Sequence, residues 1–209
     1  SLWLDAQDIS FNDDNFSVSD NDYISTWVDL SGNGHVARQS NSEFQPSINA
    51  TAELVQFNGD YMTTHLNIGS DEMSDFRIFT VYEASAGTIW AKDKTATEFY
   101  LDDSELGYGD GDGELLTIPG LLSDTGSMVL LDIYFSSDEN QSTVYLNGHL
   151  TNTFTAGSIS DSEFSIGISG LADYAISGNI AEIIVVSGNV TDNDRAKIST
   201  ALAGRWGID

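Results

Sequence analysis

Short apolar or alternating segments recur along the chain, and residues that favour turns separate them. The segments concentrate Val, Ile, Tyr, Phe and Thr, a composition typical of β-strands. They lie at residues 54–57, 76–82, 98–101, 128–135, 143–146 and 180–186. Many short strands at fairly even spacing predict an antiparallel β-sandwich or barrel.

The clearest predicted hairpin is centred on Asn147-Gly148. Apolar residues flank this dipeptide, and Asn-Gly favours the positive φ angles of a tight type I′ turn. Asn58-Gly59-Asp60 and the segment 110–113 carry similar turn signals. The turns therefore support the same all-β interpretation.

One helix is predicted, at the C-terminus. Thr191 is placed to cap it, and Asp192 and Asp194 follow in the first turn, near the positive end of the helix dipole. Gly204 is expected to end the helix, with Arg205 favourably placed near its last carbonyls. One face carries the apolar positions Ala196, Ile198, Ala201 and Leu202.

The composition is strongly acidic. The 209 residues include 33 Asp or Glu and only 7 Lys or Arg, which gives a formal net charge of -26. Such a chain repels a phosphate backbone and an anionic lipid surface, so we expect no nucleic-acid partner and no membrane binding. The charge suits a saline or calcium-containing setting, where cations screen it; the alternative is that it only keeps the protein in solution.

Cysteine is missing from the sequence, which excludes disulfides, thiolate metal sites and cysteine nucleophiles. No run of about 18 apolar residues occurs, so we expect no membrane-inserted segment. The sequence starts Ser1-Leu2-Trp3, without an initiator Met or a signal peptide. We interpret it as a fragment, monomeric by itself, of a larger chain with flanking domains.

Three ordered stretches carry a family resemblance that spans nearly the whole chain. They are Leu-Trp-Leu-Asp-Ala at 2–6 with Trp-Val-Asp-Leu-Ser-Gly-Asn-Gly-His at 27–35, Val-Gln-Phe-Asn-Gly-Asp-Tyr-Met at 55–62, and Gly-Asn-Ile-Ala-Glu-Ile-Ile-Val at 178–185 leading to Leu-Ala-Gly-Arg-Trp-Gly-Ile at 202–208. Together they resemble a bacterial laminin-G-like domain of the concanavalin A-like lectin and glucanase superfamily. The acidic, cysteine-free composition also resembles long RTX-type adhesins.

The resemblance implies one domain over residues 1–209. Its fold would be all-β: a jelly-roll β-sandwich of two antiparallel sheets with one short C-terminal helix, the first and last strands lying close together. Large aromatic side chains are expected in its core, namely Trp3, Trp27, Phe57 and Trp206. A loop is expected to form through side-chain to backbone hydrogen bonds of Asp29, Ser31 and Asn33, whose alternative role is to ligate a metal.

Some members of this superfamily are glycoside hydrolases with catalytic carboxylates on one strand, spaced Glu-x-Asp-x-x-Glu. That spacing places an acid and a nucleophile about 5.5 Å apart. The pattern is missing here; Asp102, Asp103 and Glu105 come nearest but do not match it. We therefore expect no enzymatic activity, with an acid pair contributed by two strands as the alternative.

Calcium is the predicted cofactor, because it prefers the carboxylate and carbonyl oxygens that this chain offers. Asp110-Gly111-Asp112-Gly113-Glu114 alternates acids with glycines and resembles a piece of an RTX calcium repeat. Asp102 and Asp103 lie just upstream. The candidate ligands are Asp102, Asp103, Asp110 and Asp112, and the acids at 13–14 and 20–22 are further candidates. A solvated acidic loop is the alternative for each cluster.

A ligand site is predicted from the loops that hold calcium in the pentraxin-like relatives. These loops correspond here to 92–94 and 169–174, although the acidic runs typical of pentraxins are missing. Aromatic stacking on a sugar ring, with acids binding the hydroxyls, gives the candidates Trp90, Asp93, Asp173 and Tyr174. The alternative is that Trp90 and Tyr174 are packing residues.

These observations predict a non-catalytic, extracellular binding module of a bacterial surface or secreted adhesin. Its partner would be a glycan or a peptide on another cell surface, bound with calcium. Two alternatives remain: a structural spacer in an extracellular repeat protein, and an atypical glycoside hydrolase. The fold alone does not separate them, because one fold hosts many functions.

Overall fold

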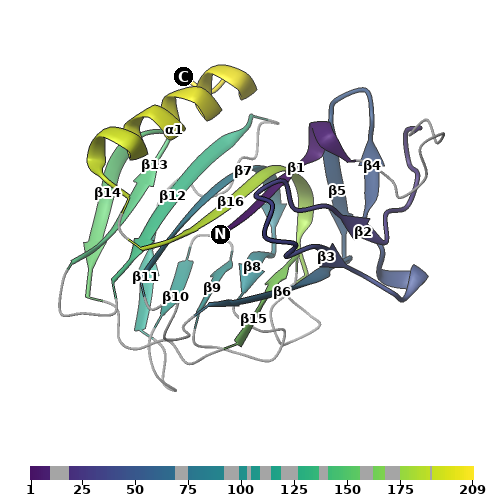
Figure 1. Cartoon of the computed structure of the whole chain (residues 1–209), viewed down its shortest axis with the longest axis horizontal. Helices are drawn as coiled ribbons and strands as arrows, with labels where there is room; N and C mark the ends of the chain where they lie inside the picture. The colour runs from purple at the N-terminus through teal and green to yellow at the C-terminus, as the bar shows by residue number, and fades with distance from the viewer. Residues whose placement is uncertain are drawn as a thin grey trace.

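Two antiparallel sheets face each other in the computed structural model, and one helix lies outside them (Figure 1). The structure describes residues 1–9, 19–68, 75–91, 99–102, 105–108, 114–118, 127–136, 141–155, 162–167, 175–188 and 190–209. For residues 68, 99–102, 105–108, 114–117 and 162 it describes the backbone only. Within these residues, no helix is long and apolar enough to cross a membrane.

Among the described residues, sheet A has eight strands and contains the longest ones. Its order is β14-β13-β12-β7-β16-β5-β4, with β1 added against β16. The bounds are β1 Leu2–Asp5, β4 Ser47–Asn49, β5 Leu54–Asn58, β7 Phe76–Ala86, β12 Val129–Phe135, β13 Ser142–Leu146, β14 His149–Phe154 and β16 Ser177–Ser187. Because β1 pairs with β16, the first and last strands are neighbours, as the family resemblance implies.

Sheet B also has eight strands, in the order β11-β10-β9-β8-β15-β6-β3-β2. The bounds are β2 Thr26–Trp27, β3 Ala37–Arg38, β6 Met62–Ile68, β8 Thr88–Ala91, β9 Phe99–Asp102, β10 Glu105–Tyr108, β11 Glu114–Thr117 and β15 Ser162–Ile166. Two short 3-10 helices, η1 Ala6–Asp8 and η2 Ser42–Phe44, interrupt the connections. The predicted jelly-roll β-sandwich is therefore the observed fold.

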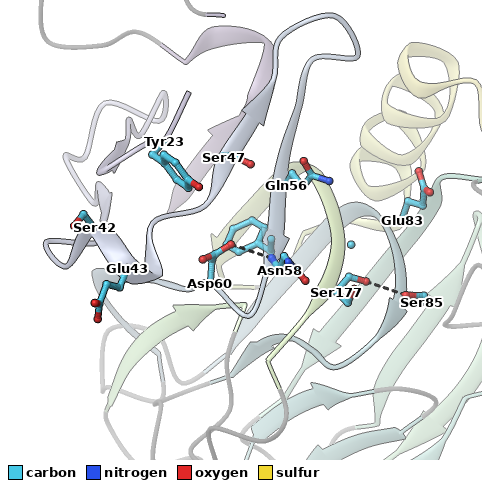
Figure 2. A pocket seen from close by; sticks show the side chains of 12 residues that line it. Tyr23, Ser42, Glu43, Ser47, Gln56, Asn58, Asp60, Glu83, Ser85 and Ser177 are labelled. Atoms are coloured by element: carbon cyan, nitrogen blue, oxygen red, sulfur yellow. Dashed lines mark hydrogen bonds between the residues drawn. The ribbon is translucent and has the colours of Figure 1, made fainter. Parts of the chain in front are cut away.

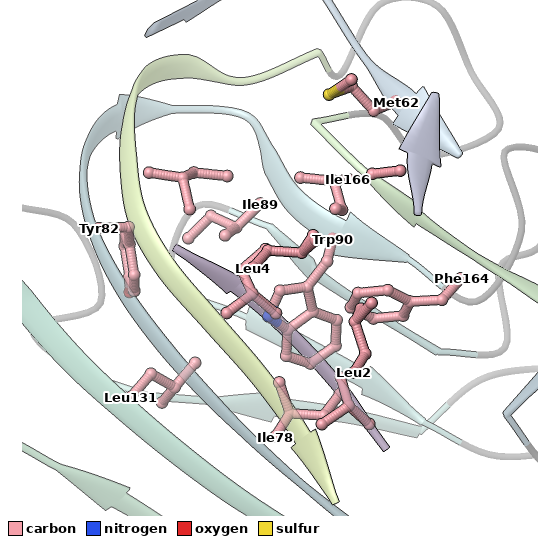
Figure 3. Close-up of a cluster of buried hydrophobic side chains, with 14 of the residues drawn as sticks. Leu2, Leu4, Met62, Ile78, Tyr82, Ile89, Trp90, Leu131, Phe164 and Ile166 are labelled. Carbon is pink, nitrogen blue, oxygen red and sulfur yellow. The ribbon is translucent and has the colours of Figure 1, made fainter. Parts of the chain in front are cut away.

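The main core lies between the two sheets (Figure 3). Strand alternation builds it: in β7, Ile78 and Tyr82 point inward, whereas Phe79 and Val81 point to the outer face of sheet A. Trp27 and Phe57 are buried there as predicted. The Asn147-Gly148 turn joins β13 to β14 with φ angles of 48° and 80°, which confirms the predicted hairpin.

Helix α1, Asp192–Trp206, covers part of the outer face of sheet A (Figure 1). Thr191 caps it through a hydrogen bond from the Asp194 N–H. The prediction that Gly204 ends the helix is wrong. Gly207 ends it instead, with a φ of 66°, and the Gly207 and Ile208 N–H groups both bond the Ala203 carbonyl.

Trp3 and Trp206 lie on this outer face, not in the main core as predicted. Trp3 is 37% exposed, and Trp206 is half-buried beside Leu202 and Ile198. Both indole N–H groups donate to the buried carboxylate of Glu182 on β16. A tryptophan side chain has a polar N–H group as well as an apolar ring. In Trp3 and Trp206, the hydrogen bond of this N–H group determines where the side chain lies.

Candidate functional site

A groove of about 630 Å³ opens on the part of the sheet A outer face that α1 leaves uncovered (Figure 2). Its floor comes from β5, β16 and β7, with Gln56, Phe57, Asn58, Ser177, Gly178, Glu83 and Ser85. Its wall comes from the segment before β4, the first residue of β4 and the turn before β6, with Tyr23, Ser42, Glu43, Ser47 and Asp60. The volume falls within the usual range for small-molecule sites, about 300–1,000 Å³.

Strand alternation explains why this floor is polar. In β5, Val55 and Phe57 are buried in the main core, so Gln56 and Asn58 point outward. In β7, the side of the strand that carries Phe79 and Val81 under α1 continues as Glu83 and Ser85, beyond the helix. The same face is therefore apolar where the helix covers it and polar where it is open.

The sheet register places one polar row across four strands. Ser47 is opposite Gln56, Gln56 is opposite Asn179, and Asn179 is opposite Glu83. Opposed residues of an antiparallel pair share a face, so the row presents a hydroxyl, two amides and a carboxylate side by side. Three strand spacings of about 4.8 Å give the row a length of about 14 Å.

Tyr23 forms the aromatic part of the wall. It makes an isolated antiparallel bridge with Ser47, and the flanking backbone is held by bonds from Ile24 N–H to the Pro46 carbonyl (2.8 Å) and from Ile48 N–H to the Asp22 carbonyl (2.9 Å). These bonds fix the backbone, while the side chain stays 68% exposed. Tyr23 therefore presents an exposed aromatic ring, on a fixed backbone, beside the polar row (Figure 2).

Asp60 lies in the turn between β5 and β6 and faces the groove (Figure 2). Its carboxylate accepts the Asn58 N–H at 3.0 Å. Burial raises the pKa of Asp60, and this single hydrogen bond does not offset the effect. The carboxyl group is thus partly desolvated and gains from any donor that enters the groove.

Gly178 gives the floor its close strand contact. A Cβ atom at this position would lie 2.3 Å from the Glu83 carbonyl oxygen and 2.6 Å from the Ala84 Cα. The pairing of β16 with β7 shifts register at Ser177/Gly178, and the Ser85 hydroxyl bonds the Ser177 carbonyl at 3.2 Å. Bulges of this kind are frequent next to functional sites, because they re-aim side chains.

The predicted ligand site is not found at Trp90. This side chain is fully buried between the sheets (Figure 3), its Nε1 donates to the Thr80 hydroxyl at 3.1 Å, and its ring lies 6.1 Å from that of Phe164. The whole of β8 is buried, so no sugar can stack on Trp90, and the packing alternative holds. The other candidates, Asp93, Asp173 and Tyr174, lie outside the described residues.

The predicted calcium ligands are described only in part. Asp102 ends β9, and its backbone is opposite Glu105. Asp103, Asp110 and Asp112 lie outside the described residues. Within the part of the chain that the structure describes, no group of three or more His, Asp or Glu is arranged to hold a metal.

Asp29 builds a loop, as predicted. Its oxygens accept the N–H groups of Trp3, Ser31 and His35 and the Ser31 hydroxyl, at 2.8–3.0 Å. Burial acts to raise the pKa of Asp29, but these hydrogen bonds together lower it. Asn33 completes the loop through bonds to Ser1 and Ser31. Because its carboxylate accepts these four hydrogen bonds, Asp29 stabilises the loop.

The sequence alone does not predict the groove, because five separate chain segments contribute its residues. Asn58-Gly59-Asp60 is read correctly as a turn, but nothing local shows that Glu83 and Tyr23 lie beside it. One signal in the sequence could have indicated the groove. Positions 56 and 58 of the strand 54–58 are polar and face away from the core, and the single helix is too short to cover the whole outer face of a sheet.

Comparison with solved structures places the fold. The chain is similar to the binding domain of botulinum neurotoxin DC in complex with SialylT (TM-score 0.67, 13% identity, 96% of this chain and 50% of that one). It is also similar to an arabinofuranosidase complexed with arabinofuranosyl-α-1,2-xylobiose (TM-score 0.59, 13%, 88% and 51%). A third structure is the Ruminococcus gnavus IT-sialidase CBM40 bound to α2,3 sialyllactose (TM-score 0.50, 12%, 66% and 92%).

At these identities the likeness shows the fold, which is a jelly-roll β-sandwich. The chain spans about half the length of the neurotoxin and arabinofuranosidase chains and most of the sialidase module. No protein family matches the sequence, and no curated protein matches it. The laminin-G-like and RTX assignments accordingly stay predictions.

Proposed function

We propose that this protein is a non-catalytic carbohydrate-binding module and that the groove on sheet A holds the glycan. One observation carries the proposal: an exposed, positioned Tyr23 stands beside a polar row of hydroxyl, amide and carboxylate groups. Sugars need both features, because a pyranose ring has an apolar face of C–H groups and an edge of hydroxyls.

The groove chemistry suits that ligand. The Tyr23 ring offers flat apolar area at low conformational-entropy cost, and its hydroxyl stays free to bond at the rim. Gln56 and Asn58 each supply a donor and an acceptor, and the carboxylates of Asp60 and Glu83 accept hydroxyl protons. Water already solvates most of these groups in the free protein, so we expect the groove to bind a glycan with modest affinity.

The similar structures support the proposal without establishing it. Two of them were solved with sialylated ligands, sialyllactose and SialylT, and the third with an arabinofuranosyl-xylobiose. Chains that contain this sandwich therefore bind glycans, and this chain matches about half of the neurotoxin and arabinofuranosidase chains and most of the sialidase module. We further propose that the module works outside the cell, as part of a bacterial surface or secreted adhesin, which its charge of -26 and its lack of cysteine suit.

A broad glycan array tests the proposal. The wild-type chain should bind a defined subset of glycans, and Tyr23→Ala and Gln56→Ala should each weaken that binding by about tenfold. Leu150→Ala is the matched control: Leu150 is 56% exposed on β14, at the opposite edge of sheet A. Equal melting temperatures would show that all variants fold. Glycan binding that survives Tyr23→Ala, or the lack of binding to any glycan on the array, would overturn the proposal.

Calcium dependence is a separate proposal that rests on the acidic segments at 102–103 and 110–114. Oxygen ligands from such loops suit Ca²⁺. Calcium titration against a chelator control, followed by thermal melting, tests it. A rise in melting temperature with calcium, lost in the Asp110→Asn and Asp112→Asn double variant, is expected. Rigidity gained without any glycan binding would favour the spacer alternative.

A hydrolase is the second candidate, favoured by one observation. Asp60 has a raised pKa and shares the groove with Glu83, and a general acid needs such a carboxyl group. Reducing-sugar release from polysaccharides measures it. Release that disappears in both Asp60→Asn and Glu83→Gln would replace the binding proposal with this one.

A further inference from the structure

We infer that the groove selects glycans by charge: it rejects acidic sugars and accepts uncharged or amino sugars. The inference rests on the proposed function and specifies its ligand class. It runs opposite to the sialylated ligands of two structurally similar proteins. The reason is that carboxylates line the groove, whereas no Lys, Arg or His is among its described lining residues.

Three carboxylates surround the groove from three directions. Glu43 comes from η2 on the wall, Asp60 from the turn after β5, and Glu83 from β7 on the floor (Figure 2). The remaining lining side chains are hydroxyls, amides and aromatic rings, and none of the described lining residues is Lys, Arg or His. A sugar carboxylate in this groove would therefore meet three like charges and no counter-charge.

Four of the five described Arg and Lys side chains are paired away from the groove. Arg77 and Arg195 share the buried Asp132, at 2.5 and 3.5 Å. Lys197 pairs with Asp194 in its own helix, and Arg205 pairs with Asp5. Arg38 lies on β3 in sheet B. Lys92 and Lys94 fall outside the described residues. Four of the described cations are thus held by other carboxylates, and the fifth, Arg38, is not among the groove-lining residues.

Asp60 adds a preference to this exclusion. Its carboxyl group is partly desolvated, no cation lines the groove beside it, and the Asn58 N–H is the one donor bonded to it. An incoming hydroxyl or ammonium group would supply the missing donor, and an ammonium group would also supply the missing charge. An incoming carboxylate would supply neither and would lose its own hydration on entry.

The experiment compares glycans that share a backbone and differ in charge. Suitable probes are lactose against sialyllactose, galactose oligomers against galacturonic-acid oligomers, and N-acetylglucosamine oligomers against glucosamine oligomers. Wherever wild type binds, we expect the acidic member to bind at least about tenfold more weakly than its uncharged partner. The amino-sugar member should bind as well as the uncharged one or better. High salt should bring both affinity ratios, acidic to uncharged and amino-sugar to uncharged, closer to one, because salt screens exposed charges.

Variants assign the selectivity to the groove. Asp60→Asn with Glu83→Gln should reduce the discrimination against acidic members by roughly three- to tenfold, by removing two like charges. Glu163→Gln is the control, since it removes an exposed charge from β15 in sheet B and leaves the groove intact. This control should leave the affinity ratio of acidic to uncharged glycans unchanged. The comparison therefore separates the effect of the groove carboxylates from the effect of the overall net charge of -26.

The outcomes distinguish this inference from the function on which it rests. Acidic glycans that bind wild type as tightly as their uncharged partners, through a site that Tyr23→Ala removes, would overturn the charge selectivity and keep the carbohydrate-binding module. Discrimination that is equal in the groove variant and in Glu163→Gln would also overturn it. No binding by any probe would overturn both.

Discussion

The indole nitrogen of Trp206, in the last turn of α1, donates a 2.9 Å hydrogen bond to the carboxylate of Glu182 in β16. The other oxygen of that carboxylate accepts the indole N–H of Trp3, in β1, at 2.8 Å. Arg205 approaches the same group at 3.4 Å and pairs with Asp5 at 2.7 Å. One buried carboxylate thereby joins the first strand, the last strand and the helix beside the groove.

Glu182→Ala should destabilise the protein by about 1–3 kcal/mol, because it leaves two indole N–H groups without their acceptor. The helix should loosen first, since its end loses the bond from Trp206. Urea denaturation measures the free energy of unfolding, and hydrogen exchange of α1 measures the loosening. Glu163→Ala, an exposed carboxylate in sheet B, should change stability by less than about 0.5 kcal/mol. Equal losses in the two variants would contradict the role of Glu182.

Glu182 should also give the stability a measurable pH dependence. Burial raises its pKa above the ordinary value of 4.5, although the bonds from Trp206 and Trp3 act in the opposite direction. A carboxyl group with a raised folded-state pKa stabilises the fold fully below its unfolded pKa. This contribution is lost as the pH rises through the folded value.

Comparison of wild type with Glu182→Gln, which cannot titrate, isolates that contribution. The free energy of unfolding of wild type, relative to the variant, should rise as the pH falls from 7 towards 4.5. Urea titrations across this range provide the measurement. A difference between the two proteins that stays constant with pH, or that shrinks on acidification, would show that burial does not dominate at Glu182.

Asp132 is the second buried carboxylate that holds α1 on sheet A. It lies on β12, is 1% exposed, and pairs with the buried Arg77 and with Arg195 of the helix. Asp132→Asn should cost about 3–5 kcal/mol, because it leaves the Arg77 charge buried without a counter-ion. Lys197→Ala removes an exposed ion pair and should cost less than about 1 kcal/mol. Similar unfolding free energies in the two variants would argue against a buried ionic network.

The fold was largely predictable because its determinants are local. Alternation within strands such as β7, the Asn147-Gly148 turn and the Thr191 cap each act over a few residues. The errors fall where a distant partner decides. Trp3 lies outside the main core because Glu182, 179 residues away, accepts its N–H. Trp90 has strand neighbours that are all buried, a fact of sheet packing that its own sequence context does not show.

The candidate site was not predictable for the same reason. Tyr23 and Glu83 come to line one groove only through the sheet order β4-β5-β16-β7, which no local pattern encodes. The groove also depends on where α1 stops. Sequence reasoning put that end at Gly204, because glycine is the usual cap, but Gly207 satisfies the same rule one turn later.

Substitutions of two glycines, Gly178 in the groove floor and Gly204 in α1, test whether the close contact between β7 and β16 shapes the groove. Gly178→Ala would force a Cβ atom to 2.3 Å from the Glu83 carbonyl oxygen, and neighbouring backbone cannot rotate away. It should cost about 1–3 kcal/mol and weaken glycan binding, because β7 and β16 separate at the groove floor. A Cβ atom at Gly204, in the last turn of α1, meets nothing within 4 Å, so Gly204→Ala should instead stabilise the protein by about 0.5–1 kcal/mol, with unchanged binding. Denaturation and glycan titration of both variants test this contrast. If Gly178→Ala were as stable as wild type and bound glycan equally well, the close contact between β7 and β16 would not shape the groove.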